Sequence, residues 1–357
     1  MKTLREFYRG RRVFVTGHTG FKGAWLSQML LLIGAQVTGY ALEAPTEPSL
    51  FDLLALAHEM PSMTGDIRDY DALKAAFDLA KPEIVLHLAA QPIVLKGYQD
   101  PRGTYETNIM GTVNLLECVR HCDTVRSVVN VTTDKVYRAC GHAWEHACRE
   151  SDVLDGFDPY SNSKSCSELV TGCYVNSFFS GSGLPISTVR AANVIGGGDF
   201  AANRIIPDCV RAAMEHRPLI LRNPDSVRPY QHVLETLSAY LLLAMRQREA
   251  PGLAGAYNIG PGEGEGMRTE DLVRLFREGY GAPETVVERN PDAPYEASFL
   301  SLDCSKAKNV LGWQPRFRIE QAVALVTQWT RAWLNGQDIK AVTCGQVESF
   351  LWEREDT

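Results

Sequence analysis

Tyr160 and Lys164 are the two residues whose types and spacing point most directly to catalysis. Residues four apart on a helix lie on one face, so the lysine ammonium can sit beside the tyrosine phenol. A nearby positive charge favours the phenolate and lowers the tyrosine pKa from its usual value near ~10. The pair therefore predicts a base that takes a proton from an alcohol while hydride leaves the same carbon.

A glycine-rich loop follows a strand-like segment and opens a helix-like one near the start of the chain. Because glycine has no side chain, Gly17 and Gly20 would let the backbone approach a pyrophosphate, whose charge the helix N-terminus favours. Gly23 would allow close helix–strand packing, and His18 would line the pyrophosphate or the nicotinamide. This context turns a weak glycine pattern into a predicted dinucleotide site. The loop residues assigned to the cofactor are Gly17, His18, Gly20, Phe21, Lys22 and Gly23.

The adenosine end of the cofactor has weaker candidates. The second strand-like segment ends without the aspartate that commonly binds the ribose, so Glu43 is the nearest carboxylate for that role. These residues leave NADP open beside NAD, which is the expected cofactor. Asp66, followed by Ile67, suits a carboxylate that accepts a hydrogen bond from the adenine amine.

The composition is that of an ordinary globular protein and limits the classes of partner. The chain has 357 residues, 45% hydrophobic and 22% charged, with a net charge of −7. That charge argues against nucleic acid or an anionic membrane as the main partner. No run reaches the ~18 apolar residues that span a bilayer, and the first residues carry no apolar signal region. Nine scattered cysteines fit reduced thiols, so we expect a cytoplasmic protein.

Strand-like and helix-like segments alternate through the first half of the chain, which predicts parallel strands with helices on both faces. The expected strands are Val13–Thr16, Gln36–Tyr40, Ile84–Leu88, Val128–Thr132 and Ala256–Gly260. The expected helices are Lys22–Ile33, ended by Gly34, and Tyr105–Arg120. The predicted fold class is α/β, a Rossmann-type doubly wound parallel sheet with a smaller mixed α/β substrate-binding domain at the C-terminus.

These motifs resemble the extended short-chain dehydrogenase/reductase family over nearly the whole chain. The shared motifs are Gly17-x-x-Gly20-x-x-Gly23, Asp66-Ile67, His87-Leu88-Ala89-Ala90-Gln91, Thr133-Asp134-Lys135, Tyr160-x-x-x-Lys164 and Arg190-Ala191-Ala192-Asn193. Within the family the chain is most similar to the CDP-glucose 4,6-dehydratase group. That closer resemblance is carried by the segments Gly17–Gly23, Ala44–Phe51, Asp158–Lys164, Asn193–Asp199, Arg228–Val233 and Leu302–Ala307. The resemblance adds Ala89 and Ala90 to the cofactor-binding residues.

The resemblance implies that CDP-glucose loses water, without net oxidation, to give CDP-4-keto-6-deoxyglucose. Tyr160 would take the C4 hydroxyl proton, Thr133 would hydrogen-bond the C4 oxygen, and Lys164 would hold the nicotinamide ribose. Asp134 would be the acid for the C6 hydroxyl and Lys135 the base for the C5 hydrogen. A lysine acts as a base only when it is desolvated or crowded by positive charge.

Substrate binding is expected from Asn193 and Arg228, because an arginine matches phosphate oxygens in a planar, bidentate way. Arg204 and Glu296 complete the predicted substrate-binding set. Relatives generally carry tryptophan where Tyr230 stands, and the segment 294–299 lacks their usual histidine. Specificity for the cytidine base is therefore open.

The predicted domain boundaries follow the change in sequence rhythm after about residue 190. Residues 1–190 form the expected NAD(P)-binding domain, to which 230–260 return, and 191–229 with 261–357 form the nucleotide-sugar-binding domain. Relatives commonly dimerise through the helices near Tyr105–Arg120 and Tyr160–Val170. The resemblance thus implies a homodimer or a higher homo-oligomer.

Three other functions stay open. A dehydratase for another nucleotide-linked hexose fits the same motifs. An epimerase or a reductase needs no acid–base pair for elimination, so Asp134 and Lys135 argue against both. A cofactor-binding sensor without catalysis would usually lose Tyr160 or Lys164, and both are present.

A cluster of metal-binding residue types occurs once, between residues 140 and 148. Its members are Cys140, His142, His146 and Cys148. These four could make a tetrahedral zinc site, but their spacing is not a standard finger arrangement. We expect a variable loop and no metal.

Overall fold

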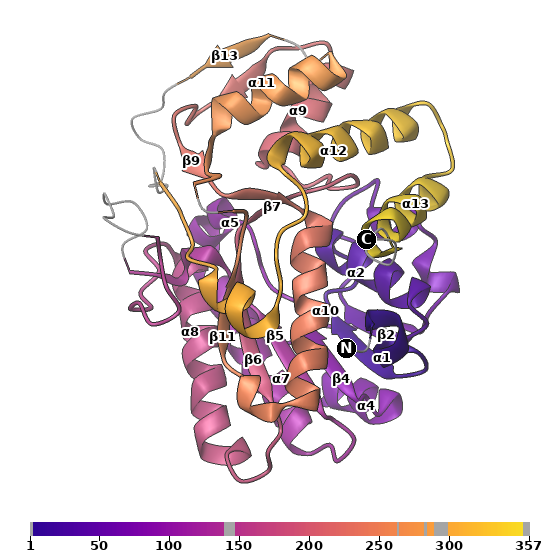
Figure 1. The fold of residues 1–357 in the computed structure, drawn as a ribbon, viewed down its shortest axis with the longest axis vertical. Coiled ribbons are helices and arrows are strands. Elements are labelled where there is room, and N and C mark those ends of the chain that lie inside the picture. The colour runs from indigo at the N-terminus through magenta and orange to yellow at the C-terminus, as the bar shows by residue number, and fades with distance from the viewer. Residues whose placement is uncertain (1–2, 139–146, 263, 282–283, 289–298, 353–357) are drawn as a thin grey trace.

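The computed structural model describes residues 3–138, 147–262, 264–281, 284–288 and 299–352, with a seven-stranded parallel sheet at the centre (Figure 1). The strand order is β11-β6-β5-β4-β1-β2-β3. The strands are β1 Arg12–Thr16, β2 Gln36–Ala41, β3 Ser62–Thr64, β4 Ile84–His87, β5 Ser127–Val131, β6 Ile186–Ala191 and β11 Ala256–Ile259. The sheet grows in opposite directions from β1 and β4, which confirms the predicted doubly wound fold. The expected return of the strand near residue 256 to this sheet is also confirmed, since β11 pairs with β6.

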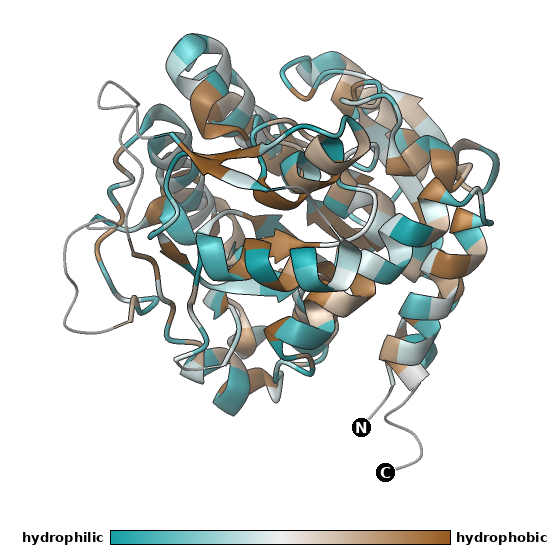
Figure 2. Ribbon diagram, turned by 90° about the horizontal axis from the view of Figure 1, so that it is seen from above, coloured by the Kyte–Doolittle hydropathy of each residue, from teal (hydrophilic) through white to brown (hydrophobic). Residues whose placement is uncertain are grey.

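Helices cover both faces of the sheet because each strand sends alternate side chains to opposite faces. Val13 and Val15 pack in one core with α2 (Phe21–Leu32) and α10 (Val233–Glu249). Phe14 packs in the other core with α4 (Tyr70–Ala80) and α7 (Gly111–Arg120). Burial on both sides explains why the strands are nearly continuous apolar runs. Apolar residues accordingly gather towards the sheet, and hydrophilic residues lie on the outer surfaces of the helices (Figure 2).

The helix expected over Tyr105–Arg120 is interrupted by a π-helical turn at Glu106–Met110. The turn lies between α6 (Pro101–Tyr105) and α7. It carries the buried Asn108, whose amide donates to Ser163 Oγ at 2.8 Å and to the Gln91 carbonyl at 3.1 Å. Sequence periodicity does not predict such a turn, because side chains distant in the sequence support it.

The second lobe lies above the sheet in Figure 1 and has a core of its own. It contains α9 (Ile205–Met214), α11 (Thr269–Tyr280) and α12 (Ile319–Leu334). Three two-stranded sheets join it: β7 (Asn193–Ile195) with β10 (Tyr230–His232), β9 (Val227–Arg228) with β12 (Met267–Arg268), and β8 (Leu219–Leu221) with β13 (Thr285–Val287). This is the mixed α/β unit that the sequence predicts.

The last helix, α13 (Ile339–Trp352), packs both on α2 beside the central sheet and on α12 of the second lobe. Ile339, Val347 and Phe350 belong to the same core as Trp25 of α2. The Thr343 hydroxyl of this helix accepts a hydrogen bond from Trp329 Nε1 of α12 at 2.9 Å, so the helix contacts both lobes. The sequence of this short apolar helix does not indicate which helices it packs against.

Short elements complete the described ranges. They are α1 Leu4–Tyr8, α3 Leu50–Leu53 and α5 Val94–Gln99, with 3-10 turns at Leu56–His58, Asp134–Val136 and Pro251–Leu253 and π-helical turns at Val175–Phe179 and Ala307–Leu311. None of the helices described is long and apolar enough to cross a membrane.

Helix α8 (Pro159–Tyr174) packs on the sheet through polar side chains. Its buried residues include Ser163, Lys164, Ser167, Glu168 and Thr171. The Glu168 carboxylate accepts hydrogen bonds from Thr132, Thr188 and Arg190, the last at 3.0 Å from both Nε and Nη2. The side chains of Glu168 and Arg190 are each 4% exposed, so this ion pair is screened from water. Hydrogen bonds, more than apolar contacts, therefore set the position of α8.

Replacing Glu168 with alanine tests this interpretation. Glu168→Ala should lower the free energy of unfolding by about 3–5 kcal/mol, because the buried Arg190 guanidinium loses its carboxylate. Urea denaturation followed by circular dichroism measures the loss. Glu117→Ala is the control, since its pairs with Arg120 and His121 lie at the surface and should contribute at most about 1 kcal/mol. Equal losses in the two variants would contradict a special role for the buried pair.

Candidate active site

The predicted chemical residues meet at the carboxyl edge of the central sheet. The glycine loop follows β1, Ala89 and Ala90 follow β4, and Thr133 follows β5. These three strands are neighbours in the order β5-β4-β1. Since adjacent strands lie about 4.8 Å apart, the loops after them are within reach of one another's side chains.

The glycine loop leaves an open face at the start of α2. A Cβ on Gly23 would lie 2.1 Å from the Gly17 oxygen, and one on Gly17, whose φ is +74°, would lie 2.8 Å from the Ala89 nitrogen. Gly20 is different, because its Cβ would meet no atom closer than 3.4 Å. Gly20 is also the N-cap of α2 and gives no side-chain cap to the first backbone N–H groups. The loop therefore fits a pyrophosphate.

The side chain of His18 is buried away from that open face. Its Nε2 lies 2.7 Å from Ser62 Oγ, and its ring packs edge-on against Phe51. A Cβ on Gly39 would lie 2.3 Å from the imidazole, so the ring fills the space above β2. Burial lowers the pKa of His18 to about 4. The His18 side chain packs against β2 and the start of β3, and its role at the cofactor stays a prediction.

The adenosine candidates lie near the ends of β2 and β3. Glu43 accepts a hydrogen bond from Thr64 Oγ1 at 3.2 Å. The Asp66 carboxylate is held by Arg68, with the closest contact at 2.6 Å, and Arg68 holds the pKa of Asp66 below its usual value. Ile67 is buried in the core between α4 and α7. The Asp66 side chain is 28% exposed, and its contact with the adenine amine stays a prediction.

Thr133, Asp134 and Lys135 follow β5 directly, with Asp134–Val136 forming a 3-10 turn. Thr133 Oγ1 donates to Asp134 Oδ1 at 3.0 Å. Asp134 is 2% exposed, and its burial raises the pKa of the carboxyl group. Lys135, the Thr133 hydrogen bond, Arg228 and Lys22 act in the opposite direction. A carboxyl group with a raised pKa suits a proton donor.

Tyr160 and Lys164 are placed by the first turns of α8. Asp158 caps the helix by accepting from the Ser161 backbone N–H at 3.0 Å. The Lys164 ammonium donates to the Val131 carbonyl at the end of β5, at 2.7 Å. This hydrogen bond ties the helix to the strand that leads into Thr133.

The pKa of Tyr160 is raised, not lowered as the sequence predicts. Burial raises the pKa of Tyr160 to about 12, against the opposing effects of a hydrogen bond with Thr133 and the positive charge of Arg204. Burial likewise lowers the pKa of Lys164 to about 8. Desolvation outweighs the neighbouring charge for both groups. The Lys164 ammonium is also engaged by the Val131 carbonyl, which the sequence could not predict.

Lys22 lies within the same group of charges. Burial lowers its pKa to about 8, and the positive charges of Arg204 and Lys164 act in the same direction. Asp134 and Asp199 partly oppose this shift. The sequence predicts that Lys22 belongs to the cofactor loop. It does not predict that the charged groups Arg204, Asp134 and Asp199 act on this lysine.

The substrate candidates come from the second lobe. Arg228 on β9 is 2% exposed and donates to the Val227 carbonyl at 3.0 Å. Asn193 on β7 is paired in register with Tyr230 on β10. Arg204 is the N-cap of α9 and is paired with Asp199 at 3.0 Å. Sequence reasoning missed Asp199, although it ends the motif Asn193–Asp199.

The sequence also singled out Tyr230, the segment 294–298 and the cluster of cysteines and histidines near residue 140. Tyr230 is 5% exposed and packs in the core of the second lobe, with its hydroxyl 3.2 Å from Thr269 Oγ1. Tyr230 therefore belongs to the packing of that core. Glu296 and residues 294–298 lie outside the described residues, as do 140–146. The described residues hold no group of three or more metal-ligating side chains.

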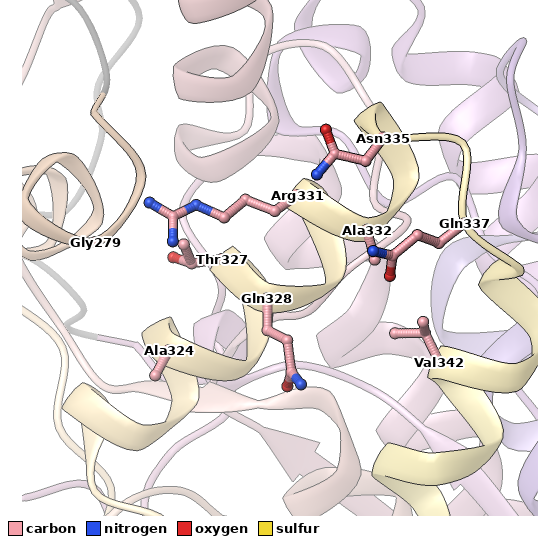
Figure 3. A pocket seen from close by; sticks show the side chains of 9 residues that line it. All are labelled: Gly279, Ala324, Thr327, Gln328, Arg331, Ala332, Asn335, Gln337 and Val342. Atoms are coloured by element: carbon pink, nitrogen blue, oxygen red, sulfur yellow. The ribbon is translucent and has the colours of Figure 1, made fainter.

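Two cavities on the molecule lie away from this group. One, of about 510 Å³, lies beside α12 and the turn to α13, and is lined by Gly279, Ala324, Thr327, Gln328, Arg331, Ala332, Asn335, Gln337 and Val342 (Figure 3). The other, of about 530 Å³, is lined by Arg149, Glu150, Ser151, Ala256, Asp303, Ser305 and Lys306. Neither contains a predicted site residue, so the site is identified by its buried ionisable groups and its place at the sheet edge.

The sequence and the fold are both similar to those of known nucleotide-sugar enzymes. The family described as GDP-mannose 4,6 dehydratase matches residues 14–326. A CDP-glucose 4,6-dehydratase of Salmonella typhimurium is 43% identical over 353 residues, covering 97% of this chain and 98% of the relative. A dTDP-glucose 4,6-dehydratase of Xanthomonas campestris pv. campestris is 28% identical, covering 90% and 94%. The solved structure of a dTDP-glucose 4,6-dehydratase from Streptomyces venezuelae with NAD bound has a TM-score of 0.78 at 26% identity, covering 91% of this chain and 98% of that one.

Two glycine variants test separately whether the open face of the loop binds the pyrophosphate and whether the loop packs tightly against α2. Gly20→Ala should fold normally but lose about tenfold or more in NAD affinity, because its methyl group enters the face left for the pyrophosphate. Gly23→Ala should lose both affinity and several degrees of Tm, since its Cβ meets backbone at 2.1 Å. Calorimetric titration with NAD and thermal unfolding measure the two effects. Unchanged NAD affinity in Gly20→Ala would show that the pyrophosphate binds elsewhere.

Proposed function

We propose, because this chain belongs to the GDP-mannose 4,6-dehydratase family, that it is a hydro-lyase that converts CDP-glucose to CDP-4-keto-6-deoxyglucose and water. The observation that carries this conclusion is the 43% identity with a CDP-glucose 4,6-dehydratase over 97% of the chain. The residues that this reaction requires follow β5 and begin α8, at one edge of the sheet. The reaction is redox-neutral, since one carbon is oxidised and another is reduced.

NAD is the cofactor of this function. The open face at Gly20 and the uncapped first turn of α2 suit its pyrophosphate, and Lys164 suits the nicotinamide ribose. Glu43 lies beyond the end of β2, where a carboxylate repels the additional phosphate of NADP. When bound, NAD supplies a hydride acceptor for C4 and later a hydride donor for C6.

Tyr160 begins the reaction by taking the proton of the C4 hydroxyl group. The Thr133 hydroxyl, which donates to Asp134 Oδ1, would turn to the C4 oxygen. Lys164 is buried beside the same site, and its positive charge stabilises negative charge on the phenol. A buried phenol with a raised pKa binds its proton tightly, so the reaction needs these charges at the moment of proton transfer.

Elimination of water is the task of Asp134 and Lys135. The ketone formed at C4 makes the hydrogen on C5 acidic, and Lys135 removes it as a base. Asp134 protonates the C6 hydroxyl group, which leaves as water. Burial of the carboxyl group raises the pKa of Asp134. The raised pKa keeps a proton available for this step.

The nucleotide end is proposed to bind in the second lobe. Arg228 and Asn193 grip the diphosphate, and Arg204 and Glu296 complete the substrate contacts. In this proposal residues 1–190 with 230–260 bind the cofactor, and 191–229 with 261–357 bind the nucleotide sugar. The Asp134–Lys135 pair favours this dehydratase over an epimerase or a reductase, which needs no elimination.

We further propose a homodimer formed through α7 and α8. Met110 and Leu169 are exposed by 49% and 60%, and Phe178, after α8, by 48%. Apolar side chains of this size on neighbouring helices suit burial against a second copy. The sedimentation coefficient of the purified protein tests this assembly, and a monomer at micromolar concentration would contradict it.

Activity on a set of nucleotide sugars tests the function. Purified protein incubated with CDP-glucose and NAD should form a product lighter by one water, detected by mass spectrometry, without accumulation of reduced cofactor. The dTDP-, GDP- and UDP-glucose reactions measure specificity for the base. Tyr160→Phe should reduce the rate by about 10³-fold and serves as the control. Loss of water from none of the four sugars would contradict the proposed function.

A further inference from the structure

Helix α8 holds the end of β5, which comes just before the turn Asp134–Val136. The Lys164 ammonium donates to the Val131 carbonyl at 2.7 Å. The Thr132 hydroxyl donates to Glu168 Oε1 at 2.5 Å. Both contacts are buried, so the chain approaches the turn from a fixed position.

Ser165, the residue of α8 that follows Lys164, holds the other end of this turn. Its hydroxyl donates to the Val136 carbonyl at 2.8 Å, whereas the Ser161 carbonyl lies farther away, at 3.1 Å. The same oxygen accepts a hydrogen bond from the Gly156 backbone N–H at 3.0 Å. Ser165 and Val136 are both buried, so the hydroxyl, which donates and accepts at once, is held in one orientation.

The residues of the proposed elimination step lie between these two points of attachment. Lys135 directly precedes Val136, whereas Thr133 directly follows the end of β5 that α8 holds. Tyr160 belongs to α8 itself. A weaker hold on the Val136 carbonyl would therefore displace Lys135 and Asp134 more than Tyr160.

We infer that Ser165 is a positioning residue, which holds the turn so that Asp134 and Lys135 reach C6 and C5 of the sugar together. This role rests on the proposed function and deepens it. In that step Lys135 takes the C5 proton, and the C6 oxygen leaves as water with the proton of Asp134. Misplacement of such a pair by about 1 Å can cost about 10²-fold in rate. The base of the oxidation step and the hydroxyl that positions the elimination pair thus lie on one helix.

Ser165→Ala tests this role, because alanine favours the helix and removes only the hydroxyl group. Elimination should slow by about tenfold or more, whereas oxidation at C4 should be nearly unchanged. The 4-keto sugar that still carries its C6 hydroxyl group should then accumulate during a single turnover of CDP-glucose by the protein with NAD. Mass spectrometry of rapidly quenched samples measures this intermediate, and absorbance measures the reduced nicotinamide that accompanies it.

Ser167→Ala is the matched control on the same helix. Ser167 is also buried, but its hydroxyl oxygen lies 3.0 Å from Asn130 Nδ2 and 2.9 Å from Thr112 Oγ1. Neither partner belongs to the turn Asp134–Val136. Each variant should lose a few degrees of Tm at most. Ser167→Ala should accumulate no more of the 4-keto intermediate than the unmodified protein does.

The outcomes separate this role from the proposed function. Accumulation in Ser165→Ala but not in Ser167→Ala supports the inference. A lower rate of turnover without accumulation, equal accumulation in both variants, or unchanged turnover of Ser165→Ala overturns it. The unmodified protein tests the function first: if it removes water from none of the nucleotide-linked hexoses, the proposed function fails before the variants are compared.

Discussion

The rest of the structure depends on one constraint: the face of α8 that meets the sheet is polar, and every strong hydrogen-bonding group on it needs a partner. An unpaired polar group in the interior costs about 1–3 kcal/mol. Hydrogen bonds to the strands therefore fix the rotation of α8 about its axis and its position along the strands. Glu168 binds Arg190 on β6, and Lys164 binds the Val131 carbonyl on β5. Tyr160, one turn before Lys164, is thereby held over the residues that follow β5.

The same burial determines the electrostatics of the site. Desolvation raises the pKa values of Tyr160 and Asp134 and lowers those of Lys164 and Lys22. Each group is thereby pushed towards its neutral form, and each then depends on its neighbours to change charge. A dehydratase requires this arrangement, because its proton donor, its base and its activated alcohol act within one cycle. The neighbouring charges come from both lobes, since Arg204 acts on Lys22 and Arg228 acts on Asp134.

The sequence predicts the sheet well because its signals are local. Val13–Thr16 and Ile84–Leu88 are apolar runs between turn residues, and they appear as β1 and β4. The glycine loop was located by its context, and its geometry follows from the absence of a Cβ. What the sequence could not predict are long-range effects: the burial of His18, the packing of α13 on α2, and the upward shift of the Tyr160 pKa. Desolvation depends on atoms distant along the chain, so residue spacing carries no information about it.

In the proposed reaction, one hydride leaves C4 as Tyr160 takes the hydroxyl proton, the Asp134–Lys135 pair then eliminates water, and the hydride returns to C6 of the same sugar. The direct test uses CDP-glucose carrying deuterium at C4, followed by mass spectrometry and NMR of the product. We expect deuterium at C6 of the 4-keto-6-deoxy sugar in nearly every molecule, with no reduced cofactor released. Deuterium lost to solvent or to free cofactor, or retained at C4, would contradict it.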